Sequence, residues 1–201
     1  MVIKPNAIYN LPTINDWQYQ IALIASRLTL NLLDRDEMID FTHYLMNNGY
    51  YDDLMLNIID DCDFLTFNEL SELLSKTLEN LNLITLNKEQ AKCFYTFSLI
   101  YPLTIRPFKL SFYAHHYFSD KNSENKILDL YSMLLQNYHY NYNAIDNIDN
   151  FVNHAYIFEE NIALKMDIHK PILEFLDECE HWLNTNQNTI TTIIQRASLI
   201  K

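Results

Sequence analysis

Carboxylates are the most concentrated chemical groups in this chain of 201 residues. Residues 34–82, called the acidic segment below, hold twelve acidic and two basic side chains, so about a quarter of the chain carries −10 of a total net charge of −12. Carboxylates at this density could bind a divalent cation or attract a cationic surface. A charged run is also commonly no more than a solvated face, and the sequence leaves that interpretation open.

Helix capping accounts for only part of this charge. Asp34 and its acidic neighbours begin a predicted helix, where the helix dipole favours negative charge. Asp60, Asp61 and Asp63 instead follow a short predicted helix, and capping does not explain all three. The predicted partner-binding set therefore takes the acidic and aromatic side chains around this point: Tyr50, Tyr51, Asp52, Asp53, Asp60, Asp61, Asp63, Glu69 and Glu72.

Two adjacent tyrosines give this set its apolar component. Tyr50 and Tyr51 follow Gly49 and precede Asp52 and Asp53, and we expect both rings to be exposed. Aromatic rings flanked by acids are good anchors for a cationic partner. The alternative is a hydrophobic contact that closes the turn after the preceding helix.

The same carboxylates do not match a calcium-binding loop. Asp61 and Asp63, with Glu72 at the twelfth place, have the outer spacing of an EF-hand. Leu65 stands where the fifth-position oxygen ligand belongs, and Thr66 stands where the turn requires glycine. The sequence therefore argues against a calcium site here.

Two histidines suggest a weaker metal hypothesis. Asp40 with His43, and Glu178 with His181, each place a carboxylate and an imidazole on one helix face, as di-iron bundles do. Such a site also needs glutamates from two further helices, and none stands out. A helical metal-dependent enzyme that uses His43 and His181 is therefore the third of three functional hypotheses, and we predict no cofactor.

Other catalytic signatures are missing from the sequence. There is no nucleophile elbow, no phosphate-binding glycine loop and no zinc-protease motif, so an enzyme is not the favoured class. Cys62, Cys93 and Cys179 are odd in number and far apart, which predicts free thiols in a reducing cytoplasm. We expect no export signal and no membrane-spanning segment, because the longest uncharged stretch is short and contains Pro102.

The elements that position these groups are predicted to be helices throughout. The single glycine disfavours sheet-rich and nucleotide-binding folds, which need glycine for tight turns. Helix starts are predicted from capping patterns, and stops from glycine or proline. The starts are Thr13 with Asp16, Asp34 with Glu37, Asp52, Thr66 with Glu69, and Asn87 with Gln90; the stops are Gly49 and Pro102.

The later part of the chain continues the helical pattern. We expect one long helix over 145–166 and another from Pro171 to Leu183, whereas Thr189–Leu199 also has strand propensity. The predicted fold class is all-α, an irregular bundle or antiparallel helical-hairpin array of about nine or ten helices. Residues 1–201 are predicted to form a single helical domain.

Net charge narrows the class of partner. A sequence pI of about 4.8 argues against nucleic acid and against anionic lipid, because both require clustered lysine and arginine. A basic protein is the expected partner. No oligomeric state is predicted.

Residues 33–61 read as an acid-capped helix, a glycine turn and a second acid-capped helix. This run resembles the small helical immunity proteins of bacterial contact-dependent and polymorphic toxin systems. The resemblance implies a cytoplasmic protein that neutralises a cognate toxin, often a basic nuclease, with its carboxylates in place of nucleic-acid phosphates. The second hypothesis is a helical adaptor or scaffold that binds another cytosolic protein.

Overall fold

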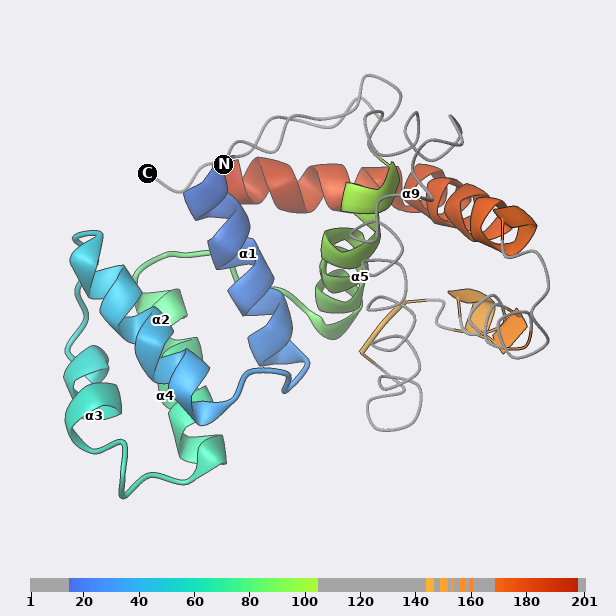
Figure 1. Cartoon of the computed structure of the whole chain (residues 1–201). Helices are drawn as coiled ribbons and strands as arrows, with labels where there is room; N and C mark the ends of the chain where they lie inside the picture. Colours follow the sequence, from blue (N-terminus) through green and yellow to red (C-terminus); the bar gives the residue numbers. More distant parts are fainter. Residues whose placement is uncertain are drawn as a thin grey trace. The chain divides into compact units, whose positions relative to one another are not determined.

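The computed structural model describes residues 15–104, 144–146, 149–151, 153, 156–157, 160 and 169–198. All regular structure in these residues is helical, which confirms the all-α prediction (Figure 1). The bounded helices are α1 Asp16–Thr29, α2 Arg35–Asn47, α3 Leu54–Asp60, α4 Phe67–Asn80, α5 Lys88–Thr104 and α9 His169–Ser198. None of the helices in this described part is long and apolar enough to cross a lipid bilayer.

Some of the predicted elements lie outside the described residues. The described positions between 149 and 160 are helical, as predicted, whereas 144–146 form a bend and turn, so the predicted start at 145 was wrong. Residues 161–166 of that predicted helix lie outside the described residues. Residues 105–143 are not described. The count of nine or ten helices therefore stays a prediction.

The chain folds as two compact units. Among the described residues, 15–91 and 193–198 belong to the first, called unit 1, and the remainder belong to unit 2. The acidic segment lies entirely within unit 1. The single domain over residues 1–201 stays a prediction.

Capping boxes start α1, α2 and α4 as pairs of reciprocal hydrogen bonds. The predicted boxes at Asp34 and Thr66 are confirmed, because each side chain accepts from the backbone N–H three residues on, and that glutamate accepts from the cap backbone. The prediction for α1 was wrong by two residues. Asn15, paired with Gln18, is its N-cap.

The same helices end with a residue in the left-handed conformation. Gly49 has φ 83°, as its predicted role at the end of α2 requires. Asn31 and Asn82, at φ 57° and 53°, do the same after α1 and α4. In all three ends this residue and the next donate back to the last helical turn, forming Schellman motifs. Asparagine thus replaces glycine, which lets a chain with one glycine end its helices.

Two predicted helix ends are wrong. Pro102 does not stop α5, which continues to Thr104. A proline so near the C-terminus removes one hydrogen bond, and the Thr104 hydroxyl donates to the Tyr101 carbonyl at 2.9 Å in that last turn.

The second wrong end concerns α9, which is one helix of 30 residues and not two elements. Its part after residue 189 was predicted to be ambiguous because of strand propensity. Ile190, Ile193, Ile194 and Ala197 are all buried there. Their spacing is helical, so burial of one face outweighs the local preference.

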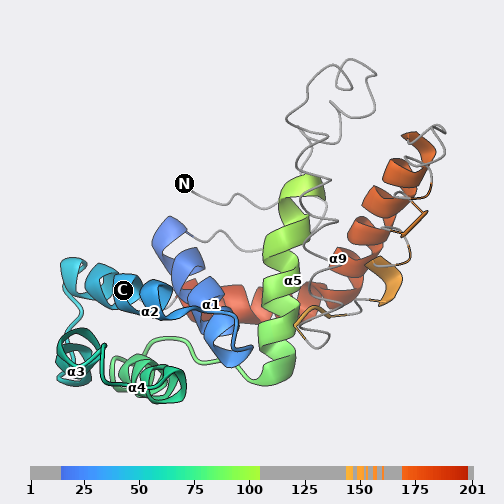
Figure 2. The same ribbon diagram turned by 60° about the horizontal axis from the view of Figure 1, so that its bottom comes forward.

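The helices α2, α3 and α4 pack against one another and carry the acidic segment (Figures 1 and 2). Each contributes fully buried side chains at helical spacing. The buried positions are Met38, Phe41, Thr42, Leu45, Met55, Ile58, Leu70, Leu74, Thr77 and Leu78. This shared core fixes the outer faces on which the carboxylates lie.

Candidate functional site

Most carboxylates of the acidic segment are on the surface. Ten of its twelve acidic side chains are exposed, and only Glu37 and Asp52 are half-buried. Exposure alone does not distinguish a binding surface from a solvated face. The useful distinction is between carboxylates that stabilise the fold and those that do not.

Three residues of the predicted binding set have partners within the acidic segment. Asp52 accepts a hydrogen bond from the backbone N–H of Leu54, the first residue of α3, at 3.0 Å and another from the Asn80 amide of α4 at 2.9 Å, so it joins the start of α3 to α4. Glu69 belongs to the capping box of α4, and its hydrogen bonds with Thr66 hold its pKa below the usual range.

Glu72 is the third of these residues. Its carboxylate lies 2.7 Å from the ammonium group of Lys76, one turn along the exposed face of α4. An exposed i,i+4 pair of this kind contributes little to stability. It does, however, offset the charge of Glu72.

The two tyrosines occupy different environments. Tyr50 is half-buried and stacks on Trp17 of α1, with ring centroids 5.1 Å apart, so the prediction that it is exposed was wrong. As the residue after the left-handed Gly49, it closes the end of α2 against α1. Tyr51 is 55% exposed, as expected. Partial desolvation, the charge and hydrogen bond of Asp53 and the charge of Asp52 raise the Tyr51 pKa.

Asp60, Asp61 and Asp63 form a separate group at one end of α3. All three are exposed, and no described hydrogen bond or ion pair involves their carboxylates. Asp60 is the last residue of α3, and Asp61 is its C-cap. The dipole of a helix disfavours negative charge at this end, so it does not stabilise the charges of Asp60 and Asp61.

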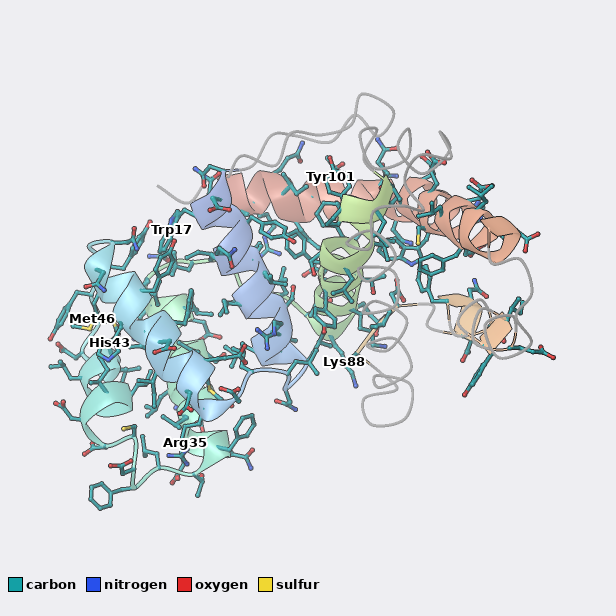
Figure 3. All side chains as sticks on the ribbon, in the orientation of Figure 1. Trp17, Arg35, His43, Met46, Lys88 and Tyr101 are labelled. Atoms are coloured by element: carbon teal, nitrogen blue, oxygen red, sulfur yellow. The ribbon has the colours of Figure 1, made fainter. Side chains whose placement is uncertain are left out.

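The turn that follows is held by Arg35 at the start of α2. Its guanidinium donates to the backbone carbonyls of Cys62 and Leu65, the latter at 2.6 Å. Figure 3 shows Arg35 at the lower end of α2, beside this turn. We call residues 61–66 the α3–α4 turn.

Phe64 is absent from the predicted binding set, although it belongs to the same surface. Its side chain is 87% exposed, more than any other large apolar side chain among the described residues. The sequence did contain a signal. Leu65 and Leu70 have the spacing of a hydrophobic staple around the Thr66 cap, which leaves Phe64 without a position on either helix face.

The described arginines do not neutralise the exposed carboxylates. Arg27 pairs with the half-buried Glu37 through two contacts at 2.7 and 2.8 Å and also donates to the Leu32 carbonyl. Arg35 binds the α3–α4 turn, and Arg196 of α9 donates to the carbonyl of Thr85. Each of the three guanidinium groups donates to at least one backbone carbonyl.

The described residues give the metal hypothesis no support. His43 and His181 are both exposed (His43 is labelled in Figure 3). Within this part of the chain, no three histidine, cysteine, aspartate or glutamate side chains are grouped closely enough to hold a metal ion.

One of the described thiols, Cys93, is not an activated nucleophile. Cys93 is buried, and burial together with the negative charge of Asp146 raises its pKa to about 12. A thiol with this pKa stays protonated at neutral pH, and the thiolate is the nucleophilic form.

The candidate site is therefore the surface of α2–α4, and its chemistry is that of uncompensated carboxylates with an exposed aromatic ring. Such a surface attracts cations by long-range electrostatics and offers an apolar contact at short range. Comparison with known proteins adds no assignment to this geometry. No protein-family model, no curated protein and no solved structure matches the chain.

Proposed function

We propose that this chain is an acidic protein-binding module that acts as an immunity protein and neutralises a cognate basic bacterial toxin, with a nuclease as the expected toxin class. The observation that carries the proposal is the uncompensated charge of the acidic segment. Ten of its twelve carboxylates are exposed, Arg27 is paired with the half-buried Glu37, and Arg35 donates to backbone carbonyls. Self-repulsion of this kind is a cost to folding that a cationic partner would remove.

The mechanism follows from the different distances over which electrostatic attraction and apolar contact act. Negative charge acts over about a Debye length, roughly 8–10 Å at physiological salt, so it accelerates encounter with a basic partner. Apolar contact acts only after docking and sets the residence time. On a nuclease, the carboxylates would occupy the place of nucleic-acid phosphates and so block the substrate.

Two finer expectations belong to the same proposal. The protein works in the cytoplasm, where a toxin of this kind would reach its target. Its complete fold is an irregular bundle or hairpin array of about nine or ten helices, of which unit 1 supplies the binding surface.

The experiment uses genetic neighbourhood, because an immunity gene lies immediately downstream of its toxin gene. The gene that precedes this one is expressed alone and together with the full chain. We expect arrested growth in the first case and normal growth in the second, with a complex that can be purified. Absence of protection by the full chain would contradict the proposal.

Charge is then tested with two matched variants of the purified chain. In one, Asp60, Asp61 and Asp63 are replaced by Lys; in the other, three exposed carboxylates elsewhere in the segment, Asp36, Asp40 and Glu79, are replaced by Lys. Both change the net charge by the same amount. We expect slower association with the toxin and a weaker salt dependence in both variants. Association rates that do not respond to either charge reversal would rule out electrostatic recognition.

A further inference from the structure

Phe64 has an exposure that the fold does not require. Single exposed apolar side chains are common on protein surfaces and need no explanation by themselves. This ring, however, is 87% exposed in a turn between two helices, and its neighbours on both sides are acidic or half-buried. Replacing it with a polar residue would cost the fold almost no buried area.

The backbone around Phe64 is held by hydrogen bonds inside the α3–α4 turn and by hydrogen bonds from Arg35 of α2. The N–H groups of Phe64 and Leu65 both donate to the Asp61 carbonyl, at 2.9 and 3.2 Å. Arg35 binds two further carbonyls of the α3–α4 turn, and the Thr66 N–H donates to Glu69 at 2.7 Å. A side chain presented on ordered backbone loses little conformational entropy on binding.

The acidic residues beside Phe64 determine which kind of partner surface the ring can contact. Asp60, Asp61 and Asp63 lie within four positions of Phe64, and the first two are at the disfavoured end of the α3 dipole. A partner surface with lysine or arginine would relieve this repulsion and could also place a cation against the ring face. An acidic or purely apolar partner surface would leave the three carboxylates unpaired or desolvated.

We propose that the α3–α4 turn is the docking element of this protein, with Phe64 as the apolar anchor that enters a pocket rimmed by lysine or arginine on a basic protein partner. The inference rests on the proposed function, because the partner class comes from the charge of the acidic segment. It adds the location of the contact and the residue that determines its lifetime. Arg35 is the positioning residue that holds the anchor in place.

The test selects ligands without knowledge of the partner. A library of random twelve-residue peptides displayed on phage is panned against the full chain, and the selected peptides are synthesised. We expect peptides that combine lysine or arginine with a large apolar residue. Binding should fall about tenfold or more in Phe64→Ala, as for a central anchor, and stay unchanged in Tyr156→Ala. Tyr156 is the matched control because it is 44% exposed and lies in unit 2.

Arg35 separates anchoring from simple charge attraction. Arg35→Ala makes the turn more negative, so attraction alone predicts tighter binding of a basic peptide. Loss of the two carbonyl contacts predicts weaker binding, and we expect the weaker binding. Arg35→Lys keeps the charge but loses the planar fork, so we expect it to weaken binding as well. Circular dichroism confirms that each variant is folded.

Each remaining outcome has a definite meaning. Basic peptides that bind Phe64→Ala as well as the parent chain would overturn the docking inference and leave the proposed function standing. Selected peptides that are acidic or uncharged, or the selection of none, would also overturn the docking inference. In that case the growth-protection experiment decides the proposed function independently.

Discussion

Glu37 shows how a single carboxylate of the acidic segment can be structural. Burial raises its pKa, but hydrogen bonds from Arg27 and from the Asp34 backbone, together with the Arg27 charge, outweigh this effect and lower the pKa below 4.5. The pair joins α1 to the start of α2, with side chains 26% and 37% exposed. Carboxylates of the acidic segment thus differ in role because they contact different groups.

Glu37→Gln tests the contribution of this pair. A lowered pKa in the folded state stabilises the protein above the unfolded pKa, and this stabilisation is lost as pH falls through the folded value. At pH 7 we expect a loss of about 1–2 kcal/mol in the free energy of unfolding, reduced by partial exposure. The difference should disappear in acid. Urea unfolding at pH 7 and pH 3 measures it.

Glu79→Gln is the matched control for this measurement, because Glu79 is exposed and has no described side-chain partner. Its free energy of unfolding should stay close to that of the parent chain at both pH values. A loss in Glu37→Gln that is equally large at pH 3 would show that packing and not ionisation is responsible.

Among the secondary-structure elements, the ends of the helices are the best-defined feature of unit 1. Local hydrogen bonds at Asp34 and Thr66 start α2 and α4, and left-handed residues after α1, α2 and α4 end them. These signals act over three or four residues, which is why the sequence predicted most of them. The asparagine ends were harder to predict, since asparagine is also common in ordinary loops.

Gly49→Ala tests these ends. A Cβ at Gly49 would meet no atom within 4 Å, so the only cost is the left-handed backbone, at φ 83°. We expect a loss of about 1 kcal/mol in the free energy of unfolding. In Asn82→Gly the change relieves the backbone, so stability should stay equal or rise by a few tenths of a kcal/mol. Chemical denaturation measures the free energy of unfolding of both variants. A similar loss of stability in both would contradict the explanation from backbone conformation.

Over the molecule as a whole, charge is distributed unevenly. The acidic segment supplies −10 of the net −12 and lies within unit 1. Among the twelve carboxylates of the acidic segment, all of them described, Glu37 and Glu72 form ion pairs, with Arg27 and Lys76. The free protein therefore carries repulsion that pairing does not cancel.

Salt should stabilise the free protein for this reason. Raising NaCl from about 20 mM to about 0.5 M shortens the Debye length from roughly 20 Å to 4 Å and screens the repulsion, so we expect the melting temperature to rise by about 2–5 °C. A variant in which Asp60, Asp61 and Asp63 are replaced by Asn should melt at a higher temperature than the parent chain in low salt. Its melting temperature should also rise less when salt is added. A melting temperature that falls with salt would mean that attractive pairs dominate instead.

Composition and local pattern were enough to predict the helical class, the free cysteines and the position of the charge. They also predicted the helix starts at Asp34 and Thr66, because capping depends only on residues close together along the chain. The roles of individual site residues did not follow from them. Asp52 and Tyr50 were grouped with the binding set, although Asp52 bonds to Asn80 and Tyr50 stacks on Trp17.

These roles became visible only in the folded chain, because each depends on a partner distant in sequence. Arg35 reaches the turn near residue 65, and α9 continues past its strand-like stretch because one face of it is buried. The exposure of Phe64 is likewise settled by the packing of α2–α4, which leaves that side chain no place in the core. Contacts between distant segments, which no local pattern specifies, separate a structural carboxylate from one that is available to a partner.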